Sequence, residues 1–208
     1  SRDGLHARAP SDPDSQPDMS AHPADPAIHR VPIVDVSDPT SPSVVGSLSL
    51  TGSPKSVDVM GQTAYVASHS GGLRVVDVTD PTSPTLLGHY DTPNYTFDVQ
   101  VQGSVAYLAE WEHGLTTIDV TDPTNPQVLG HIDVGPIQNG VSVVGTTVYT
   151  SDYSGGMRVF DASDASDPIQ IGFFNNAEGL YEVLHVVGSM AYLADWNHGL
   201  RLVDVSDP

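Results

Sequence analysis

Short segments in which hydrophobic and polar residues alternate run through most of the chain, separated by turns rich in Gly, Pro, Asp, Ser and Thr. This period-two pattern is typical of β-strands with one buried face. Within residues 54–92 it predicts four strands, over 56–60, 63–67, 73–78 and 85–90. The dipeptide Gly61-Gln62 is expected to form the hairpin turn between the first two. The pattern therefore predicts an all-β chain of antiparallel strands.

The same four-strand unit recurs at a fixed spacing, marked by the motif Val-Asp-Val-Thr/Ser-Asp-Pro. The first aspartate of each copy lies at Asp35, Asp77, Asp119, Asp161 and Asp204, so the steps are 42, 42, 42 and 43 residues. A period near 40 residues with four short strands per repeat is the pattern of β-propeller blades around an axis. In each repeat we expect a tyrosine to pack between blades and glycines to occupy turns with positive φ.

The run Tyr65-Val-Ala, followed by Gly72-Leu-Arg-Val-Val-Asp-Val-Thr-Asp-Pro, resembles the LVIVD-repeat family of bacterial and archaeal cell-surface or secreted β-propeller proteins. The resemblance covers residues 31–208, although residues 161–168 depart from the motif. It implies an extracellular or cell-surface propeller, and it fixes no catalytic residue.

Two regions are expected. Residues 1–28 are rich in Pro, Asp and Ser without hydrophobic periodicity, which predicts an extended or disordered arm, or one that docks on a neighbouring molecule. Residues 29–208 form the β-propeller repeat domain.

The predicted strands do not divide evenly into blades. Third strands number five, whereas first, second and fourth strands number four each. We expect about four blades, closed by an N-terminal outer strand either within the chain or from a neighbouring subunit. The second route leads to oligomers or filaments, and a fragment of a longer propeller is the remaining alternative. The residues assigned to closure are Val44, Val45, Leu48, Ile33 and Val34.

The chain is strongly acidic, with 26 Asp and Glu against 7 Lys and Arg and a formal net charge of −19. Such a surface repels nucleic acid and anionic membranes, because both are bound by clustered basic residues. The apolar runs are too short for a membrane-spanning helix. Expected partners are therefore a second copy of the chain, other surface proteins, glycans or cations. Cysteine is absent, so neither disulfides nor thiolate metal sites are expected.

The repeated Asp-Pro loops carry paired carboxylates, which suit Ca²⁺ coordination by oxygen ligands. The weak Ca²⁺ candidates are Asp77, Asp80, Asp119 and Asp122. The alternative is ordinary turn chemistry, in which the side chain accepts backbone N–H bonds.

The turns between second and third strands differ from repeat to repeat and are expected to share one face of the propeller. Carboxylates beside exposed Trp and Tyr suit a glycan or cation site, and histidines from separate blades suit a transition metal. The tentative ligand-binding residues are Glu110, Trp111, His113, Asp152, Tyr153, Asp195, Trp196 and His198, with His69 on the same face. The alternative is that each Trp caps its own blade.

Two further predictions concern single positions. The polar residues Asp58, Gln100, Ser142 and His185 occupy one aligned place on the first strands and are expected to line a wet channel. Asn94 begins an Asn-Tyr-Thr triplet, which is a weak N-glycosylation acceptor.

The sequence contains no nucleophile elbow, phosphate-binding glycine loop or His-Glu-x-x-His motif. Only neighbouring carboxylates such as Glu110 and Glu112 suit acid–base chemistry, so a hydrolase is a distant alternative. We therefore predict a non-enzymatic extracellular or cell-surface structural or interaction module, with self-assembly by strand exchange into an oligomer or filament as one of the two routes to closure. A glycan- or Ca²⁺-binding module is the second hypothesis.

Overall fold

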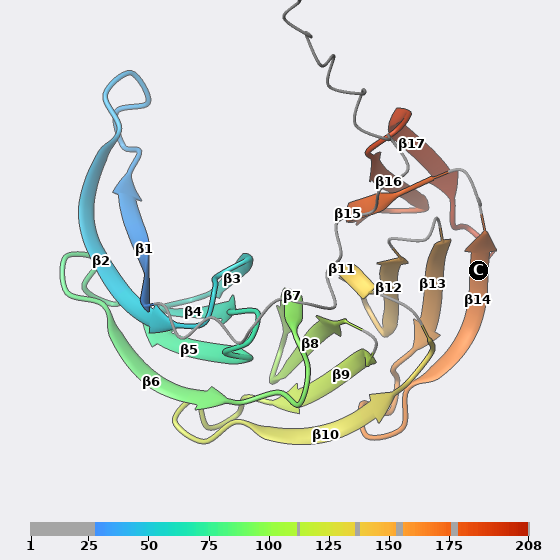
Figure 1. Cartoon of the computed structure of the whole chain (residues 1–208), viewed down its shortest axis with the longest axis horizontal. Coiled ribbons are helices and arrows are strands. Elements are labelled where there is room, and N and C mark those ends of the chain that lie inside the picture. Colours follow the sequence, from blue (N-terminus) through green and yellow to red (C-terminus); the bar gives the residue numbers. More distant parts are fainter. Residues whose placement is uncertain (1–27, 112, 136–137, 153–155, 176–178, 208) are drawn as a thin grey trace, which may run out of the picture.

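The computed structural model of the chain describes residues 28–111, 113–135, 138–152, 156–175 and 179–207. Within these residues the structure consists of 17 β-strands joined by turns and loops, with no helix. The strands form five antiparallel sheets arranged side by side along an arc (Figure 1). The predicted arm, residues 1–28, lies outside the described residues except for Ile28, where the first strand begins.

Three of the sheets are complete four-stranded blades. Blade 1 contains β3 (Ser56–Met60), β4 (Thr63–Ala67), β5 (Leu73–Asp77) and β6 (Thr85–Tyr90). Blade 2 contains β7 (Thr96–Gln102), β8 (Val105–Glu110), β9 (Gly114–Asp119) and β10 (Gln127–Ile132). Blade 3 contains β11 (Gln138–Val144), β12 (Thr147–Asp152), β13 (Gly156–Asp161) and β14 (Ile169–Asn175).

The sheets at the two ends of the arc are incomplete. The N-terminal half-blade contains β1 (Ile28–Asp35) and β2 (Ser43–Thr51), which correspond to third and fourth strands. The terminal blade contains β15 (Tyr181–Val187), β16 (Met190–Asp195) and β17 (Gly199–Asp204), which correspond to first, second and third strands. The alternation therefore located the strands correctly, and the blade 1 strands lie within a residue of their predicted bounds.

The expected hairpin position is confirmed, and so are the tyrosine positions of the three complete blades, whereas in the described part of the chain Tyr192 of the terminal blade has no following blade to pack against. Gly61 has a φ of 64° at the tip of the β3–β4 hairpin, a conformation that favours glycine. Gly72 has a φ of 68°, and a Cβ there would collide with the carbonyl oxygen of Tyr90. Tyr65, Tyr107 and Tyr149 are buried, because each lies in the packing interface between its own blade and the next.

The hydrophobic core is divided among these interfaces, which we call joints. One face of each blade, the forward face, packs on the back face of the next blade. In the joint between blades 1 and 2, Leu73 and Val75 contact Val99 and Leu108. Separate clusters fill the other three joints. Each of the three complete blades is therefore stabilised by both of its neighbours, as expected for a repeat protein.

Polar side chains on the innermost strands link successive blades, a role that the sequence did not indicate, and the expectation that they line a channel stays a prediction. The Asp58 carboxylate accepts the Val101 N–H at 2.7 Å. The Gln100 side-chain oxygen accepts the Val143 N–H at 2.6 Å, and the Ser142 hydroxyl accepts the Val186 N–H at 3.1 Å. These bonds satisfy edge N–H groups that face the inside of the arc.

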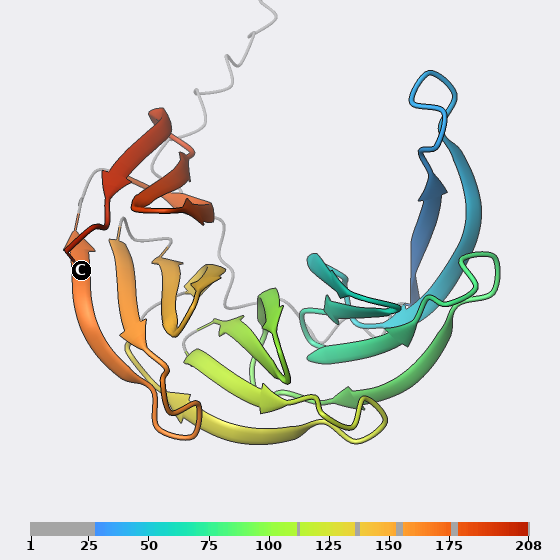
Figure 2. The same ribbon diagram turned by 180° about the vertical axis from the view of Figure 1, so that it is seen from behind.

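The arc does not close into a ring. Seen from either side, the half-blade and the terminal blade stand apart at its two ends (Figures 1 and 2). β2 pairs with β1 and not with β17. In the structure the terminal blade therefore lacks a fourth strand, and closure by the chain's own N-terminal strand, one of the two expected routes, is not made.

Candidate functional site

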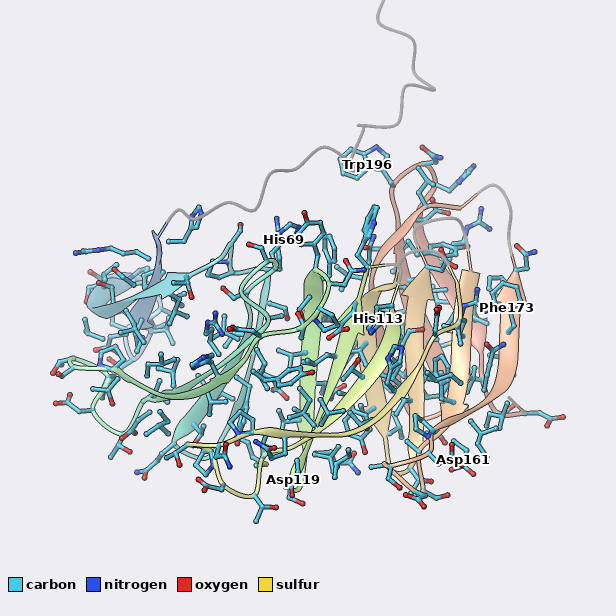
Figure 3. The ribbon with its side chains drawn as sticks, turned by 60° about the horizontal axis from the view of Figure 1, so that its bottom comes forward. His69, His113, Asp119, Asp161, Phe173 and Trp196 are labelled. Atoms are coloured by element: carbon cyan, nitrogen blue, oxygen red, sulfur yellow. The ribbon has the colours of Figure 1, made fainter. Side chains whose placement is uncertain are left out.

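The loops of the molecule fall on two opposite faces. The turns between second and third strands, which carry His69 and Trp196, lie along one face (Figure 3). The Asp-Pro loops, which follow Asp119 and Asp161, lie along the other. We call the first the turn face and the second the loop face.

On the loop face, the aspartates are bound by their own loops. Asp77 Oδ1 accepts the Thr79 N–H at 2.8 Å, and Asp80 Oδ1 accepts both the N–H and the hydroxyl of Thr82, at 2.9 and 2.7 Å. Asp119 and Asp122 repeat this geometry in the next loop. Hydrogen bonds from the following threonine lower the pKa of all four carboxyls. The contacts are those of Asx turns, and Ca²⁺ binding stays a prediction.

The carboxylates assigned to the turn face lie inside the joints. Glu110, Asp152 and Asp195 are all buried, each at the last residue of a second strand, and Ser68 occupies the matching place in blade 1. They belong to three different joints, and no cluster of three His, Asp or Glu side chains able to hold a metal occurs within the residues that the structure describes. The structure therefore distributes these carboxylates and does not gather them into one site.

In blade 3 and the terminal blade, the third strand supplies an arginine partner six residues after this position. Asp195 Oδ2 accepts a hydrogen bond from Arg201 Nε at 2.6 Å and lies 3.2 Å from His198 Nδ1. Burial acts to raise the pKa of Asp195, but the bonds from Arg201 and from backbone N–H groups lower it to about 2. Asp152 faces Arg158 in the same way, with 3.6 Å between Oδ2 and Nη2. Each pair is a buried or half-buried ion pair inside a joint.

Blade 2 breaks this pattern, because its third strand has Thr116 where the other complete blades have arginine. Glu110 is fully buried, and neither of its carboxyl oxygens has a hydrogen-bond partner among the described residues. The Thr116 hydroxyl forms a hydrogen bond with His131 Nδ1, 3.2 Å away. Burial raises the pKa of Glu110 to about 7, and Thr116 opposes this only in part. Glu110 is thus a buried carboxyl without a matching cation.

Aromatic side chains of the turn face form a row across the joint between blades 1 and 2. The His69 ring stacks on Tyr95 with 4.1 Å between centroids and meets Phe97 edge-on at 5.2 Å. Phe97 in turn lies 5.5 Å from Trp111. The backbone N–H of Trp111 donates to the Tyr95 carbonyl at 2.9 Å, which fixes this turn to the connection between blades 1 and 2. We call these four residues the aromatic row.

The remaining predicted ligand residues lie apart from the row. Trp196 is 72% exposed, on the turn of the terminal blade (Figure 3). His113 stacks on His131 with 3.9 Å between centroids, and His198 is exposed beside Asp195. Tyr153 and Glu112 lie outside the described residues. Asn94 is half-buried and accepts the Tyr95 N–H through its side-chain oxygen at 2.8 Å. Ligand binding and glycosylation both stay predictions.

The arginine partners were missed from the sequence, although a signal for them exists. An acidic residue and an arginine are spaced by six residues in two repeats, at Asp152–Arg158 and Asp195–Arg201. The spacing places them on the same face of neighbouring antiparallel strands, because a tight turn joins β16 to β17 with Asp195 paired to Gly199. A search for charge pairs across each turn would have found them.

The two ends of the arc expose surfaces that are buried elsewhere. On the terminal blade, Leu200 and Leu202 are 63% and 57% exposed, while the matching Leu73 and Val75 of blade 1 are fully buried. Tyr192 and Ala194 lie on the same forward face and are also partly or fully exposed. Within the described residues, no blade covers this forward face of the terminal blade. In the complete blades the equivalent face packs on the next blade and forms a joint.

On blade 1, the back face is uncovered near the inside of the arc. Val57 of β3 is 53% exposed, while the matching Val99 and Val141 are 3% and 4% exposed. Val59 is 56% exposed, while the matching Val143 is 7% exposed. The reason is that the half-blade has no first and second strands to cover them. Among the residues assigned to closure, Leu48 packs on blade 1. Val34 and Val44, which pair across β1 and β2, are exposed, and Ile33 and Val45 are half-buried.

These strands, joints and repeated turns define a β-propeller-like repeat protein. The LVIVD repeat family model matches residues 31–49, 51–92, 93–134, 138–176 and 182–208, so the chain belongs to the LVIVD-repeat family. The resemblance seen in the sequence is confirmed. No curated protein matches the chain. No helix in the described part of the structure is long and apolar enough to cross a membrane.

Two solved structures of computationally designed proteins share the fold. Ika4 superposes with a TM-score of 0.62 at 9% identity, over 74% of this chain and 92% of its own. Ika8 superposes with a TM-score of 0.64 at 9% identity, over 79% of this chain and 50% of its own. The chain therefore spans half the length of Ika8.

Proposed function

We propose that this chain is a non-enzymatic structural module that associates head to tail with a second copy of itself. The terminal blade of one copy packs on blade 1 of the next, and β2 of that copy completes the terminal blade as its fourth strand. The acidic composition supports a place outside the cell or on its surface.

The observation that carries self-association is the match between the two exposed faces. Leu200 and Leu202 occupy the repeat positions of Leu73 and Val75, which cover Val99 in the interior joint. Val57 occupies the repeat position of Val99. The two ends of the arc thus present the two halves of one more joint of the same kind. Exposed apolar faces of this sort mark association sites, and contact between unlike faces runs head to tail.

Completing the terminal blade brings two third strands, β17 of one copy and β1 of the other, to the same position. We expect β17 to keep this position and β1 to be displaced from it. Pro32 of β1 stands where β17 has Arg201, and proline has no N–H for the strand ladder. β17, in contrast, is tied to β16 by the Asp195–Arg201 pair.

The curvature of the arc supports a closed pair. Most of this chain superposes on half of Ika8, so the arc bends like half of a chain about twice as long. Two copies joined at both ends would then complete one ring without leaving a free end.

Molecular mass in solution tests the proposal. Light scattering coupled to gel filtration should give about twice the chain mass of 22.0 kDa at micromolar concentration. The double variant Leu200→Asp with Leu202→Asp should be monomeric, because each charge would be buried in the joint. The matched control is Ile169→Asp with Ile171→Asp, which changes residues that are 58% and 47% exposed on the outer strand β14 and should leave the mass unchanged. A monomeric unmodified protein would overturn the proposal.

A second candidate function is glycan binding on the turn face. Exposed aromatic rings suit stacking on sugars, and Trp196 is 72% exposed while Trp111 ends the aromatic row. A glycan array should then give signals that are lost in the variant Trp111→Ala with Trp196→Ala. An array without signal for the unmodified protein rejects this function.

A further inference from the structure

One aligned position on the innermost strands forms the same contact at each joint between successive blades. At this position, Asp58, Gln100 and Ser142 each accept a backbone N–H from the innermost strand of the next blade. The donors Val101, Val143 and Val186 also occupy a single repeat position. The contact therefore follows the repeat and not the identity of the side chain.

In the terminal blade this position is His185, which is exposed and has no following blade. The repeat position of the donors is filled in blade 1 by Val59, whose N–H has no preceding innermost strand and is held by its own neighbour, Asp58 Oδ1, at 2.8 Å. The terminal blade thus ends on an unused acceptor position, and blade 1 begins on an unused donor position.

From this register we infer that His185 of one copy meets the Asp58 carboxylate beside the Val59 N–H of a second copy, and that this pair makes the head-to-tail joint tighten as the pH falls. The inference rests on the self-association proposed above and identifies a residue pair that determines its strength.

The Asp58 carboxylate is fixed where His185 would arrive. Its Oδ1 accepts the Val59 N–H and its Oδ2 accepts the Val101 N–H, so it spans the inner edges of β3 and β7. In the interior joints, the residues at this repeat position in successive blades are Asp58 and Gln100, Gln100 and Ser142, and Ser142 and His185. None of these pairs combines an imidazole with a carboxylate. Only the joint between copies would set an imidazole against a carboxylate, which adds a charge-assisted hydrogen bond once the imidazole is protonated.

The other ionisable groups near this joint are few. On the His185 side, Tyr192 lies across the hairpin on β16, and β11 offers the uncharged Ser142. On the Asp58 side, Tyr65 lies across the hairpin on β4 and Asp98 lies on the adjacent strand β7, and both interact electrostatically with Asp58. Lys55 precedes β3. Burial is the largest influence on Asp98 and raises the pKa of that carboxyl. The negative charge that His185 meets therefore comes chiefly from Asp58.

The test compares dissociation constants of the dimer at pH 5.5 and pH 8, measured by sedimentation. A histidine ordinarily titrates near pH 6.5, whereas an aspartate ordinarily stays ionised over this range. The unmodified dimer should therefore bind on the order of three- to tenfold more tightly at pH 5.5. His185→Gln copies the residue of blade 2 and should remain dimeric without this extra gain. Asp58→Asn should also lose it.

The control for general loss of negative charge at low pH is His89→Gln. His89 is a half-exposed histidine on the outer strand β6, 3.9 Å from an Asp91 oxygen, and its replacement should keep the full pH response. A response in His185→Gln equal to that of His89→Gln would overturn the pairing while leaving self-association intact. Absence of any dimer in the unmodified protein would instead overturn the proposed function, and the pairing with it.

Discussion

Glu110 of blade 2 and Asp195 of the terminal blade occupy the same place in the repeat, yet they differ sharply in acidity. Both are buried at the last residue of a second strand. Asp195 is bound by Arg201, and its pKa is lowered to about 2, whereas Glu110 has no arginine opposite and burial raises its pKa to about 7. In this comparison, the arginine six positions later, together with backbone N–H donors and His198, keeps the pKa of the buried Asp195 carboxyl low.

The two carboxyls therefore act on stability in opposite pH ranges. The unfolded chain releases the Glu110 proton near pH 4.5 while the folded chain keeps it to about pH 7, so stability is lost as the pH rises through that window. Asp195 contributes stability above its ordinary pKa of 3.8, and this is lost as the pH falls toward 2.

The largest expected effect comes from removing the Glu110 charge. The raised pKa corresponds to about 3 kcal/mol, of which about 2–3 kcal/mol should be lost between pH 5 and pH 8. The variant Glu110→Gln has no carboxyl to ionise at this position. Between pH 5 and pH 8 its free energy of unfolding should therefore fall by about 2–3 kcal/mol less than that of the unmodified protein. Urea unfolding at both pH values checks this. Equal pH dependence of the two proteins would show that Glu110 is not the group responsible.

A smaller effect is expected from removing the arginine that Asp195 uses. Arg201→Met leaves a buried carboxylate held only by backbone N–H groups and His198, and should lower the free energy of unfolding by about 2 kcal/mol at pH 7. Adding Asp195→Asn to this variant should recover part of the loss, because no charge then remains buried. Urea unfolding measures both, and a double variant as unstable as the two single changes summed would argue against the pair.

The smallest effect should come from giving blade 2 the arginine that the other complete blades have. Thr116→Arg places a cation opposite Glu110, as Arg158 stands opposite Asp152, and should raise stability at pH 8 by about 1 kcal/mol. It should also reduce the loss of stability between pH 5 and pH 8. The readout is again urea unfolding, with Thr116→Met as the control of similar length without charge.

Most of the fold was predictable from the sequence, because its signals are local. Alternation in residues 56–60 and 63–67, with Gly61 between them, specifies a hairpin without any distant contact. The candidate site was less predictable. Glu110 and Trp196 both lie in or beside turns between second and third strands, but one is fully buried and the other is exposed. That difference depends on which blade packs against each turn.

The sequence by itself determined the repeat length, the four strands per blade, the turns and the surplus third strand, since these follow from period-two alternation and turn chemistry within some 40 residues. The tertiary structure decided which equivalent residues are core and which are surface. Leu73 and Leu200 occupy the same place in the same motif, yet the first is buried and the second is exposed. The physical reason is that each face of a propeller blade is buried by the neighbouring blade on that side. At the ends of this arc, the outermost faces have no such neighbour.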